Sequence, residues 1–288
     1  MKTILITDSC CDLPYQYIKE NEIEMIPLTI TIDSKEKKDD LAKTKGYEAF
    51  YQSIREGAMP KTSQVNSYDY KERFEKHIKA GEEVLCICFS AALSGCFNSA
   101  QIAMEEVKEA YPEASIQVIN SRCASMGQGL LIYYAMEQLK QGKSAAETAR
   151  YLEQLKMKIN HWFTVEDLKH LFRGGRVSRT TATVGTLLQI KPIMKVDEEG
   201  KLTAVEKVKG RKKSLKVLVE KTKELIENPE EQIVFVCHGD TLSEAELVKK
   251  ALIEECHVKD VWINHIGAAV GSHAGPGTLG IFFVGPER

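Results

Sequence analysis

Polar side chains that could bind a ligand or react gather in four short segments of this sequence. The segments combine hydroxyl groups with a carboxylate or an imidazole: Thr7-Asp8-Ser9, Thr62-Ser63-Gln64, Ser90 to Gly95, and Gly271-Ser272-His273. Each is predicted to lie at the carboxyl end of a strand or at the start of a helix. In open α/β sheets ligands bind at these strand ends, where helix N-termini present unpaired backbone N–H groups. The four segments are therefore candidates for one shared binding site.

The same side chains also have an ordinary structural interpretation. Ser94 is suited to cap a helix, and Thr62 with Ser63 to stabilise a turn. His273 can satisfy a loop carbonyl, and Asp8 follows a predicted strand, where a carboxylate most often caps the next turn or helix. Because capping is the commonest use of Ser and Thr in such places, residue types alone favour this interpretation over a binding site.

Two short basic stretches that contain glycine stand out in a nearly neutral chain. They are Arg173-Gly174-Gly175-Arg176 and Lys207 to Lys213, which includes Arg211. The chain has 39 Lys and Arg against 41 Asp and Glu, a formal net charge of −2, so it has no overall field to hold a polyanion. A nucleic-acid partner is therefore not expected. The two stretches are either solvated surface or places where a phosphate or an acidic partner surface docks.

Several common signatures of catalysis and cofactor binding are missing or out of context. Gly275 to Gly280 matches G-x-G-x-x-G, but it leads into the strand-like segment Ile281–Val284 instead of opening a helix. No P-loop is present, and Leu93-Ser94-Gly95 lacks the flanking glycine of a nucleophile elbow. The eight cysteines form no C-x-x-C pair and no histidine cluster accompanies them, which favours buried reduced thiols over zinc. No cofactor or metal is predicted.

The elements that position these segments alternate between short strands and longer helices, which is typical of βαβ units and a mainly parallel sheet. In the first half, strands are predicted at 2–7, 24–31, 84–89 and 116–120, with a charged loop from Ser34 onward. Helices are predicted at 13–21, 47–56, 66–81, 94–111, 125–140 and 144–157. Asn66 and Ser67 are the expected caps of the helix at 66–81.

The second half begins near Ile159 and has a different pattern. Strands are predicted at 161–164, 232–237, 261–265 and 280–284, with helices at 214–226 and 243–256. Ile190–Val196 and Leu202–Val208 flank the turn Asp197–Gly200 and predict an antiparallel hairpin, so this sheet should be mixed. The predicted fold is α/β in two domains. Residues 1–158 hold a doubly wound, mainly parallel sheet, and residues 159–288 a mixed sheet, a division that suits the chain length of 288.

Composition and hydropathy indicate a folded protein of the cytoplasm. Hydrophobic residues make up 43% and charged residues 28%, without a long polar tract, which excludes extended disorder. The apolar run at the N-terminus is too short for a signal peptide and is followed at once by Asp8 and Asp12. No segment approaches the roughly 18 uncharged apolar residues of a membrane-spanning helix. We therefore predict a soluble, cytoplasmic protein.

Taken in order along the chain, the short motifs resemble those of the DegV family of bacterial fatty-acid-binding proteins. No single tripeptide is specific, but the resemblance covers nearly the whole chain. The matching motifs are Thr7-Asp8-Ser9 with Asp12-Leu13-Pro14, Thr62-Ser63-Gln64, Leu93-Ser94-Gly95 with Ser99-Ala100, Ser125-Met126-Gly127 with Gly129-Leu130, Gly174-Gly175-Arg176, Lys191-Pro192, and His273 with Gly275-Pro276-Gly277. The chain departs from the family pattern at Ala91, Ala92, Cys96 and Asn120. These departures leave the preferred acyl chain length open.

The resemblance implies a ligand, a partner and a set of site residues. Related proteins hold one long-chain fatty acid, such as palmitate or oleate, in a tunnel between the two domains. They present its carboxylate to a separate fatty-acid kinase, which makes an acyl phosphate for phospholipid synthesis. For this chain, a fatty-acid ligand implies transient contact with a membrane. This chain would then be a carrier and not an enzyme.

Carried over by motif, Thr62 and Ser94 would bind the fatty-acid carboxylate and His273 would lie close to it. The supporting loop residues would be Ser63, Gly95, Asp8 and Ser9. The basic positions that match are Arg173, Arg176 and Arg211, which would serve the head-group side or kinase docking.

A serine acyl hydrolase is the alternative that the residue types leave open. Ser94 would be its nucleophile, His273 the base, and Asp8 the carboxylate that orients the base. The missing nucleophile elbow argues against this enzyme, and the spatial arrangement of the three side chains decides the matter.

Overall fold

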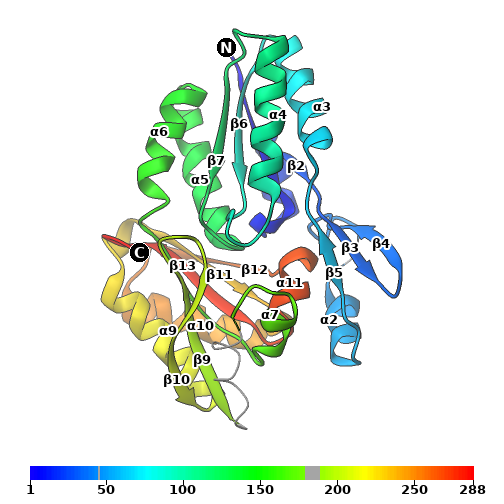
Figure 1. Cartoon of the computed structure of the whole chain (residues 1–288). Helices are drawn as coiled ribbons and strands as arrows, with labels where there is room; N and C mark the ends of the chain where they lie inside the picture. The colour runs from blue at the N-terminus through cyan, green and yellow to red at the C-terminus, as the bar shows by residue number, and fades with distance from the viewer. Residues whose placement is uncertain (45, 179–188) are drawn as a thin grey trace.

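The computed structural model describes residues 1–44, 46–178 and 189–288. Its strands form two main sheets, one above the other in Figure 1, and helices pack on both. The strands of the upper sheet lie before residue 121 and those of the lower sheet after residue 158. The division into domains at residue 158 stays a prediction.

The N-terminal sheet is parallel, as predicted. Its strand order is β2 (Glu24–Ile26), β1 (Thr3–Asp8), β6 (Glu83–Cys88) and β7 (Ile116–Asn120). Helices α3 (Ser67–Lys79) and α4 (Cys96–Ala110) cover one face, and α1 (Tyr15–Glu20), α5 (Met126–Lys140) and α6 (Ala145–Leu155) cover the other. Because side chains alternate along a strand, Ile4 and Ile6 join one core and Leu5 joins the other. This half is therefore doubly wound.

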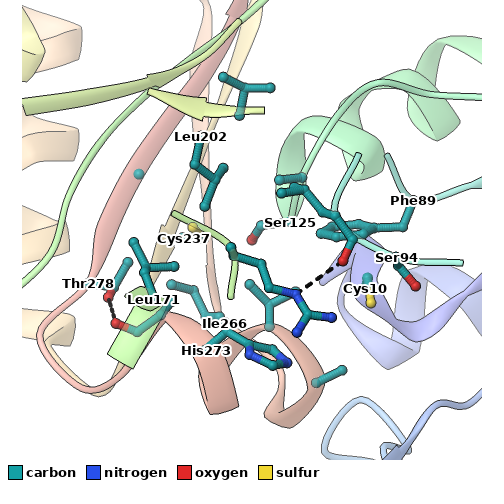
Figure 2. Close-up of a pocket in the computed structure, with 18 of the residues that line it drawn as sticks. Cys10, Phe89, Ser94, Ser125, Leu171, Leu202, Cys237, Ile266, His273 and Thr278 are labelled. Carbon is teal, nitrogen blue, oxygen red and sulfur yellow. Dashed lines mark hydrogen bonds between the residues drawn. The ribbon is translucent and has the colours of Figure 1, made fainter. Parts of the chain in front are cut away.

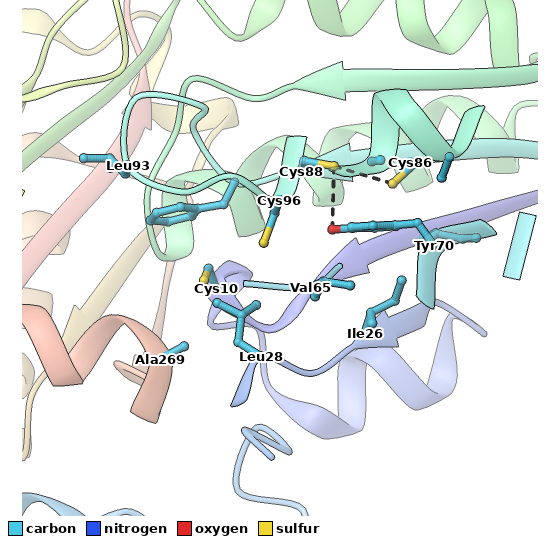
Figure 3. Packing of buried hydrophobic residues seen from close by; sticks show 14 of the residues in the cluster. Cys10, Ile26, Leu28, Val65, Tyr70, Cys86, Cys88, Leu93, Cys96 and Ala269 are labelled. Atoms are coloured by element: carbon cyan, nitrogen blue, oxygen red, sulfur yellow. Dashed lines mark hydrogen bonds between the residues drawn. The ribbon is translucent and has the colours of Figure 1, made fainter. Parts of the chain in front are cut away.

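All eight cysteines are free and buried, which confirms the prediction of reduced thiols. Figure 3 shows Cys86 and Cys88 of β6 in the core beside Tyr70 of α3. The Sγ atom of Cys88 lies 3.9 Å from the Tyr70 hydroxyl. Burial raises the pKa of the Cys88 thiol well above its usual range, so this thiol stays protonated at neutral pH.

The C-terminal sheet has six strands and is mixed, as predicted. The order is β10 (Leu202–Lys209), β9 (Ile190–Val196), β8 (Ile159–Thr164), β13 (Leu279–Val284), β11 (Ile233–His238) and β12 (Asp260–His265). Among the strand pairs that the structure describes in this sheet, only β11–β12 is parallel. Helices α9 (Arg211–Leu225) and α10 (Leu242–Cys256) cover one face. On the other face, Phe235 and Phe282 pack in one core with Leu131 of α5.

The region between β2 and α3 differs from the prediction of one strand followed by a charged loop. After β2 the chain forms β3 (Thr29–Ile32), which pairs with β4 (Lys35–Lys38) and β5 (Lys61–Ser63) in a separate antiparallel sheet, and α2 (Glu48–Arg55) lies between β4 and β5 in the chain. Pro27 interrupts the predicted strand because proline cannot donate a ladder hydrogen bond. Asp33 and Ser34 have φ of 48° and 63°, which suits a tight hairpin turn. The exposed lysines of β4 carry no apolar alternation, so the sequence gives no strand signal there.

The carboxyl ends of β1 and β6 point toward the C-terminal sheet (Figure 1), which places the loops after them between the two sheets. Two short elements complete this region: α7 (Lys169–Arg173) and α11 (Ala268–Ala274). The sequence predicts a loop at Gly271 to His273, so the helix α11 is a correction. Within the described residues, no helix has the length and apolar composition needed to span a membrane.

Candidate functional site

A cavity lies between the two sheets, at the carboxyl edge of the parallel one. Its volume is about 980 Å³, including the space at its open mouth, which falls in the size range of small-molecule sites. The walls are largely apolar and come from both halves of the chain, among them Leu28, Phe89, Phe163, Leu171, Leu202 and Phe282. Figure 2 shows Ser94 and Cys10 together in this lining and Leu202 away from them. The cavity therefore combines largely apolar walls with a polar region.

The polar region brings together Thr62 and His273, which are 211 residues apart in the sequence. Thr62 lies on β5 and His273 on α11, and Thr62 Oγ1 is 2.7 Å from His273 Nε2. Burial lowers the pKa of His273 to about 4, and the positive charges of Arg176 and Arg173 act in the same direction. The imidazole is therefore neutral at neutral pH. Its Nδ1 atom has no hydrogen-bond partner among the described residues.

Ser94 lies in the loop that leads into α4 and lines the same cavity. Its Oγ accepts the backbone N–H of Cys96 at 3.3 Å and lies 3.2 Å from Cys96 Sγ. The helix begins at Cys96, two residues later than predicted, because the N–H groups of Leu93 and Ser94 both turn back to the carbonyl of Ser90. Ser94 thus precedes the cap residue, Gly95, with its side chain at the cavity wall.

Gln64 also lines the cavity, although sequence reasoning did not single it out as a site residue. Its amide nitrogen donates to Ser99 Oγ at 2.9 Å. A methyl group on Gly95 would come within 2.0 Å of Gln64 Oε1, so Gly95 is the residue that lets this amide approach. The spacing of Thr62 and Gln64 was the available signal, because residues two apart on an extended chain point to the same side.

Of the three arginines singled out in the sequence, the structure brings Arg176 into the cavity lining. Its Nε donates to the carbonyl of Leu93 at 3.1 Å, next to Ser94. Arg173 is exposed on α7, with its guanidinium 3.2 Å from His170 Nδ1. Arg211 binds the Glu244 carboxylate, with an Nη2–Oε2 distance of 2.6 Å. Arg173 and Arg211 lie outside the lining of this cavity.

Asp8 and Ser9 support the backbone beneath the cavity and do not line it. Asp8 is fully buried, and its carboxylate accepts the N–H of Phe89 at 2.8 Å and that of Cys10 at 3.1 Å. These bonds join the loops that follow β1 and β6, and burial raises the Asp8 pKa to about 6. The Ser9 hydroxyl accepts the N–H of Leu28 at 3.1 Å. Ser63 is exposed on β5 and points away from the cavity that Thr62 lines.

The structure does not assemble the triad of a serine hydrolase. Asp8 accepts hydrogen bonds from the backbone and from Gln128, while the Nε2 atom of His273 bonds with Thr62. A hydrolase would need His273 between Ser94 and a carboxylate. Among the described residues His273 makes neither contact, so the hydrolase alternative has no geometric support.

Gly174 has no side chain, and this leaves room for the imidazole of His273. A methyl group on Gly174 would lie 2.2 Å from His273 Nδ1, and Gly174 has ordinary helical dihedrals that alanine adopts without strain. We expect Gly174→Ala to displace the imidazole and to weaken ligand binding roughly two- to tenfold, the value of one lost hydrogen bond. Calorimetric titration of the wild type and the variant with the ligand of this cavity measures the two affinities. In a His273→Ala background the same change should have no effect, and an equal effect there would contradict the explanation.

The sequence matches one family over nearly its whole length. The family model described as "Uncharacterised protein, DegV family" matches residues 2–285. A DegV domain-containing protein of Clostridium perfringens is 45% identical over 287 residues, which cover 100% of this chain and 99% of the relative.

Solved structures also match the fold over nearly the whole chain. A DegV lipid binding protein from Thermotoga maritima has a TM-score of 0.87 at 30% identity and covers 100% of both chains. A DegV family protein from Thermus thermophilus, described by its fatty acid binding, has a TM-score of 0.88 at 28% identity over 99% of this chain and 100% of the other. DegV from Bacillus subtilis, described as a fatty acid binding protein, has a TM-score of 0.84 at 27% identity over 99% of each chain. With its motifs, its two sheets and its full length all matched, the chain belongs to the DegV family.

Proposed function

We propose that this protein binds one long-chain fatty acid of the palmitate or oleate class in the cavity between two domains, residues 1–158 and 159–288. One observation carries the proposal: an apolar cavity has Thr62, Ser94 and His273 in its wall, with the Arg176 guanidinium among them. This combination suits a ligand with a long hydrocarbon tail and a single carboxylate. The fatty acid is the ligand, and the proposal includes no cofactor.

The carboxylate is held by hydroxyl groups and neighbouring charge. A neutral imidazole has one N–H, and with that hydrogen on Nε2 His273 donates to Thr62 Oγ1, 2.7 Å away. The Thr62 hydroxyl hydrogen is then free to donate to the carboxylate. Ser94 supplies a second hydroxyl, and Arg176 adds a favourable charge. His273 thus acts largely by orienting Thr62.

The tail supplies most of the affinity. Each buried methylene contributes about 0.8 kcal/mol, so a chain of about sixteen carbons offers on the order of 10 kcal/mol before the costs of association. One hydroxyl contributes about 0.5–1.5 kcal/mol. The apolar walls therefore decide whether a fatty acid binds, and the polar residues decide which end of it lies beside Thr62.

We further propose that the carboxylate is presented to a separate fatty-acid kinase, which forms an acyl phosphate for phospholipid synthesis in the cytoplasm. The protein acts as a carrier, takes its ligand during transient contact with a membrane, and leaves catalysis to the kinase. Exposed Arg173 and the partly exposed pair of Arg211 with Glu244 offer charged groups for docking. The geometric argument against a Ser94 triad supports a role in binding.

Extraction of lipids from purified protein, followed by mass spectrometry, tests the proposal directly. We expect one fatty acid per chain, and uptake of added palmitate or oleate by protein from which lipid has been removed. Protein that carries no fatty acid and takes up neither acid would overturn the proposal. Labelling of Ser94 by a fluorophosphonate, lost in Ser94→Ala, would instead favour a hydrolase.

The His273 imidazole should report the bound carboxylate, because its pKa of about 4 in the free protein leaves it neutral. An anion placed beside it stabilises the protonated form, so palmitate should raise the pKa of His273. NMR titration of the ring nitrogens, with and without palmitate, measures this shift. The exposed His257 is the internal control and should not respond. An unchanged His273 titration would show that the carboxylate binds elsewhere.

A further inference from the structure

Helix α11, which carries His273, comes from the C-terminal half of the chain but is held by buried groups from the N-terminal half. It has seven residues, from Ala268 to Ala274, too few for a helix to be stable on its own. Ala269 packs in the N-terminal core with Cys10 and Leu28 (Figure 3). The position of α11 therefore depends on what surrounds it.

Two buried aspartates bind the start of this helix. Asp12 Oδ1 accepts the N–H of Gly267 at 2.9 Å, and Asp39 Oδ2 accepts the N–H of Ala269 at 2.8 Å. The first N–H groups of a helix have no partner within it, so each carboxylate satisfies a donor that would otherwise be unpaired. The other oxygen of each carboxylate is also bonded, to the hydroxyl of Ser125 for Asp12 and to that of Tyr47 for Asp39.

Burying two carboxylates costs hydration free energy, so the hydrogen bonds of Asp12 and Asp39 with the start of α11 must offset a penalty. Asp12 has no exposed surface and Asp39 retains 2%. Burial raises the pKa of both side chains, which means that the ionised forms have lost hydration that the hydrogen bonds must replace. Both side chains come from loops, and both reach the first turn of the same short helix.

A third group, Tyr51 of α2, contacts the backbone just before α11 and in its middle. Its hydroxyl donates to the carbonyl of Ile266 at 2.7 Å, just before the helix, and its ring is fully buried. A methyl group on Gly271 would lie 2.6 Å from the Tyr51 hydroxyl oxygen, so the helix backbone rests directly against this tyrosine. Asp12, Asp39 and Tyr51 together are called the α11 clamp below.

We propose that the α11 clamp consists of positioning residues for the carboxylate site: Asp12, Asp39 and Tyr51 fix α11 so that His273 stands within hydrogen-bond distance of Thr62. The inference rests on the proposed function insofar as the site binds a carboxylate. Asp39 and Thr62 both belong to the segment between β2 and α3. This segment therefore contains Thr62 and, through Asp39, also binds the helix that carries His273. A shift of α11 would break the Thr62–His273 bond, and it would also move Ala269 and Val270, which line the cavity.

The first test observes His273 in the protein without ligand. Asp39→Ala leaves the N–H of Ala269 unpaired, and we expect the ring-nitrogen NMR signals of His273 to shift or broaden, while those of the exposed His257 stay in place. Asp39→Asn keeps an oxygen for Ala269 and should leave the His273 signals close to those of the wild type. Unchanged His273 signals in Asp39→Ala would overturn the inference, whether or not the protein binds fatty acids.

The second test is a double-mutant cycle on palmitate affinity, because a residue that acts through His273 has no effect once His273 is gone. We expect Asp39→Ala to weaken binding about tenfold in the wild-type background and less than about twofold in the His273→Ala background. Equal losses in both backgrounds would show a merely structural role and overturn the inference, leaving the proposed function intact. A wild-type protein that binds no palmitate would overturn the proposed function, with the NMR result still deciding the inference.

Two further variants guard against misfolding and general destabilisation. Tyr51→Phe removes one oxygen from the clamp and keeps the ring, so it serves where Asp39→Ala does not fold. We expect it to weaken binding about threefold, and only when His273 is present. Ser144→Ala is the matched control, since it removes the capping box of α6, away from the cavity. It should lower thermal stability without changing affinity, and an equal loss of affinity there would count against the clamp.

Discussion

Replacing Ala124 by tryptophan is expected to weaken palmitate binding by about a hundredfold or more. Ala124 lies in the loop before α5 and lines the cavity, with its backbone N–H bonded to His161 Nε2 at 3.3 Å. An indole in this place takes the room of about four methylenes, which at about 0.8 kcal/mol each amounts to roughly 3 kcal/mol of binding free energy. Titration of delipidated protein with palmitate measures the loss.

The matched control is Ala124→Ser, which changes polarity but leaves the volume nearly intact, and we expect affinity within about threefold of the wild type. The His273 signals should be the same in both variants, because the backbone N–H of Ala124 bonds with His161, whereas His273 bonds with Thr62. Normal palmitate binding by a folded Ala124→Trp protein would mean that the tail runs elsewhere. It would then remove the main support for the proposed cavity.

The sheets were predictable where local patterns and burial agree. The apolar run of β1 fits a strand that is buried on both faces, and the turn at Asp197 to Gly200 fits the antiparallel pair β9–β10. The hairpin of β3 and β4 was missed because β4 consists of exposed charged residues, which lack any apolar period. Its turn depends on positive φ at Asp33 and Ser34, for which the sequence offers only a weak signal.

The candidate residues of the site could be predicted from the sequence, but the contacts between them could not. Hydroxyl groups near strand ends made Thr62 and Ser94 candidates, but only the family resemblance joined them with His273, since no local pattern relates residues 211 positions apart. Asp8 was proposed as a possible catalytic carboxylate, and it instead holds two backbone N–H groups, the commoner use of such a residue. The helix α11 was missed because it is short and depends on Asp12 and Asp39 from the other half of the chain.

Replacing both hydroxyl-bearing residues of the carboxylate site, as Thr62→Val with Ser94→Ala, is expected to have the second largest effect. The two hydroxyls contribute about 1 kcal/mol each, so palmitate affinity should fall roughly tenfold to thirtyfold. If the proposed kinase uses this protein as its carrier, acyl-phosphate formation should fall further at saturating palmitate. The tail still binds in this variant, but the two hydroxyls no longer hold the carboxylate in the orientation that the proposed kinase needs.

Ser63→Ala is the matched control for this pair, because Ser63 neighbours Thr62 on β5 but is exposed and lies outside the cavity lining. It should keep both affinity and kinase turnover. Measuring binding by titration and turnover with saturating palmitate separates the two roles of the hydroxyls. If the double variant lost affinity but kept full turnover at saturation, the hydroxyls would hold the acid without orienting it. The carboxylate would then have to be oriented by other groups, such as the Arg176 guanidinium in the cavity wall.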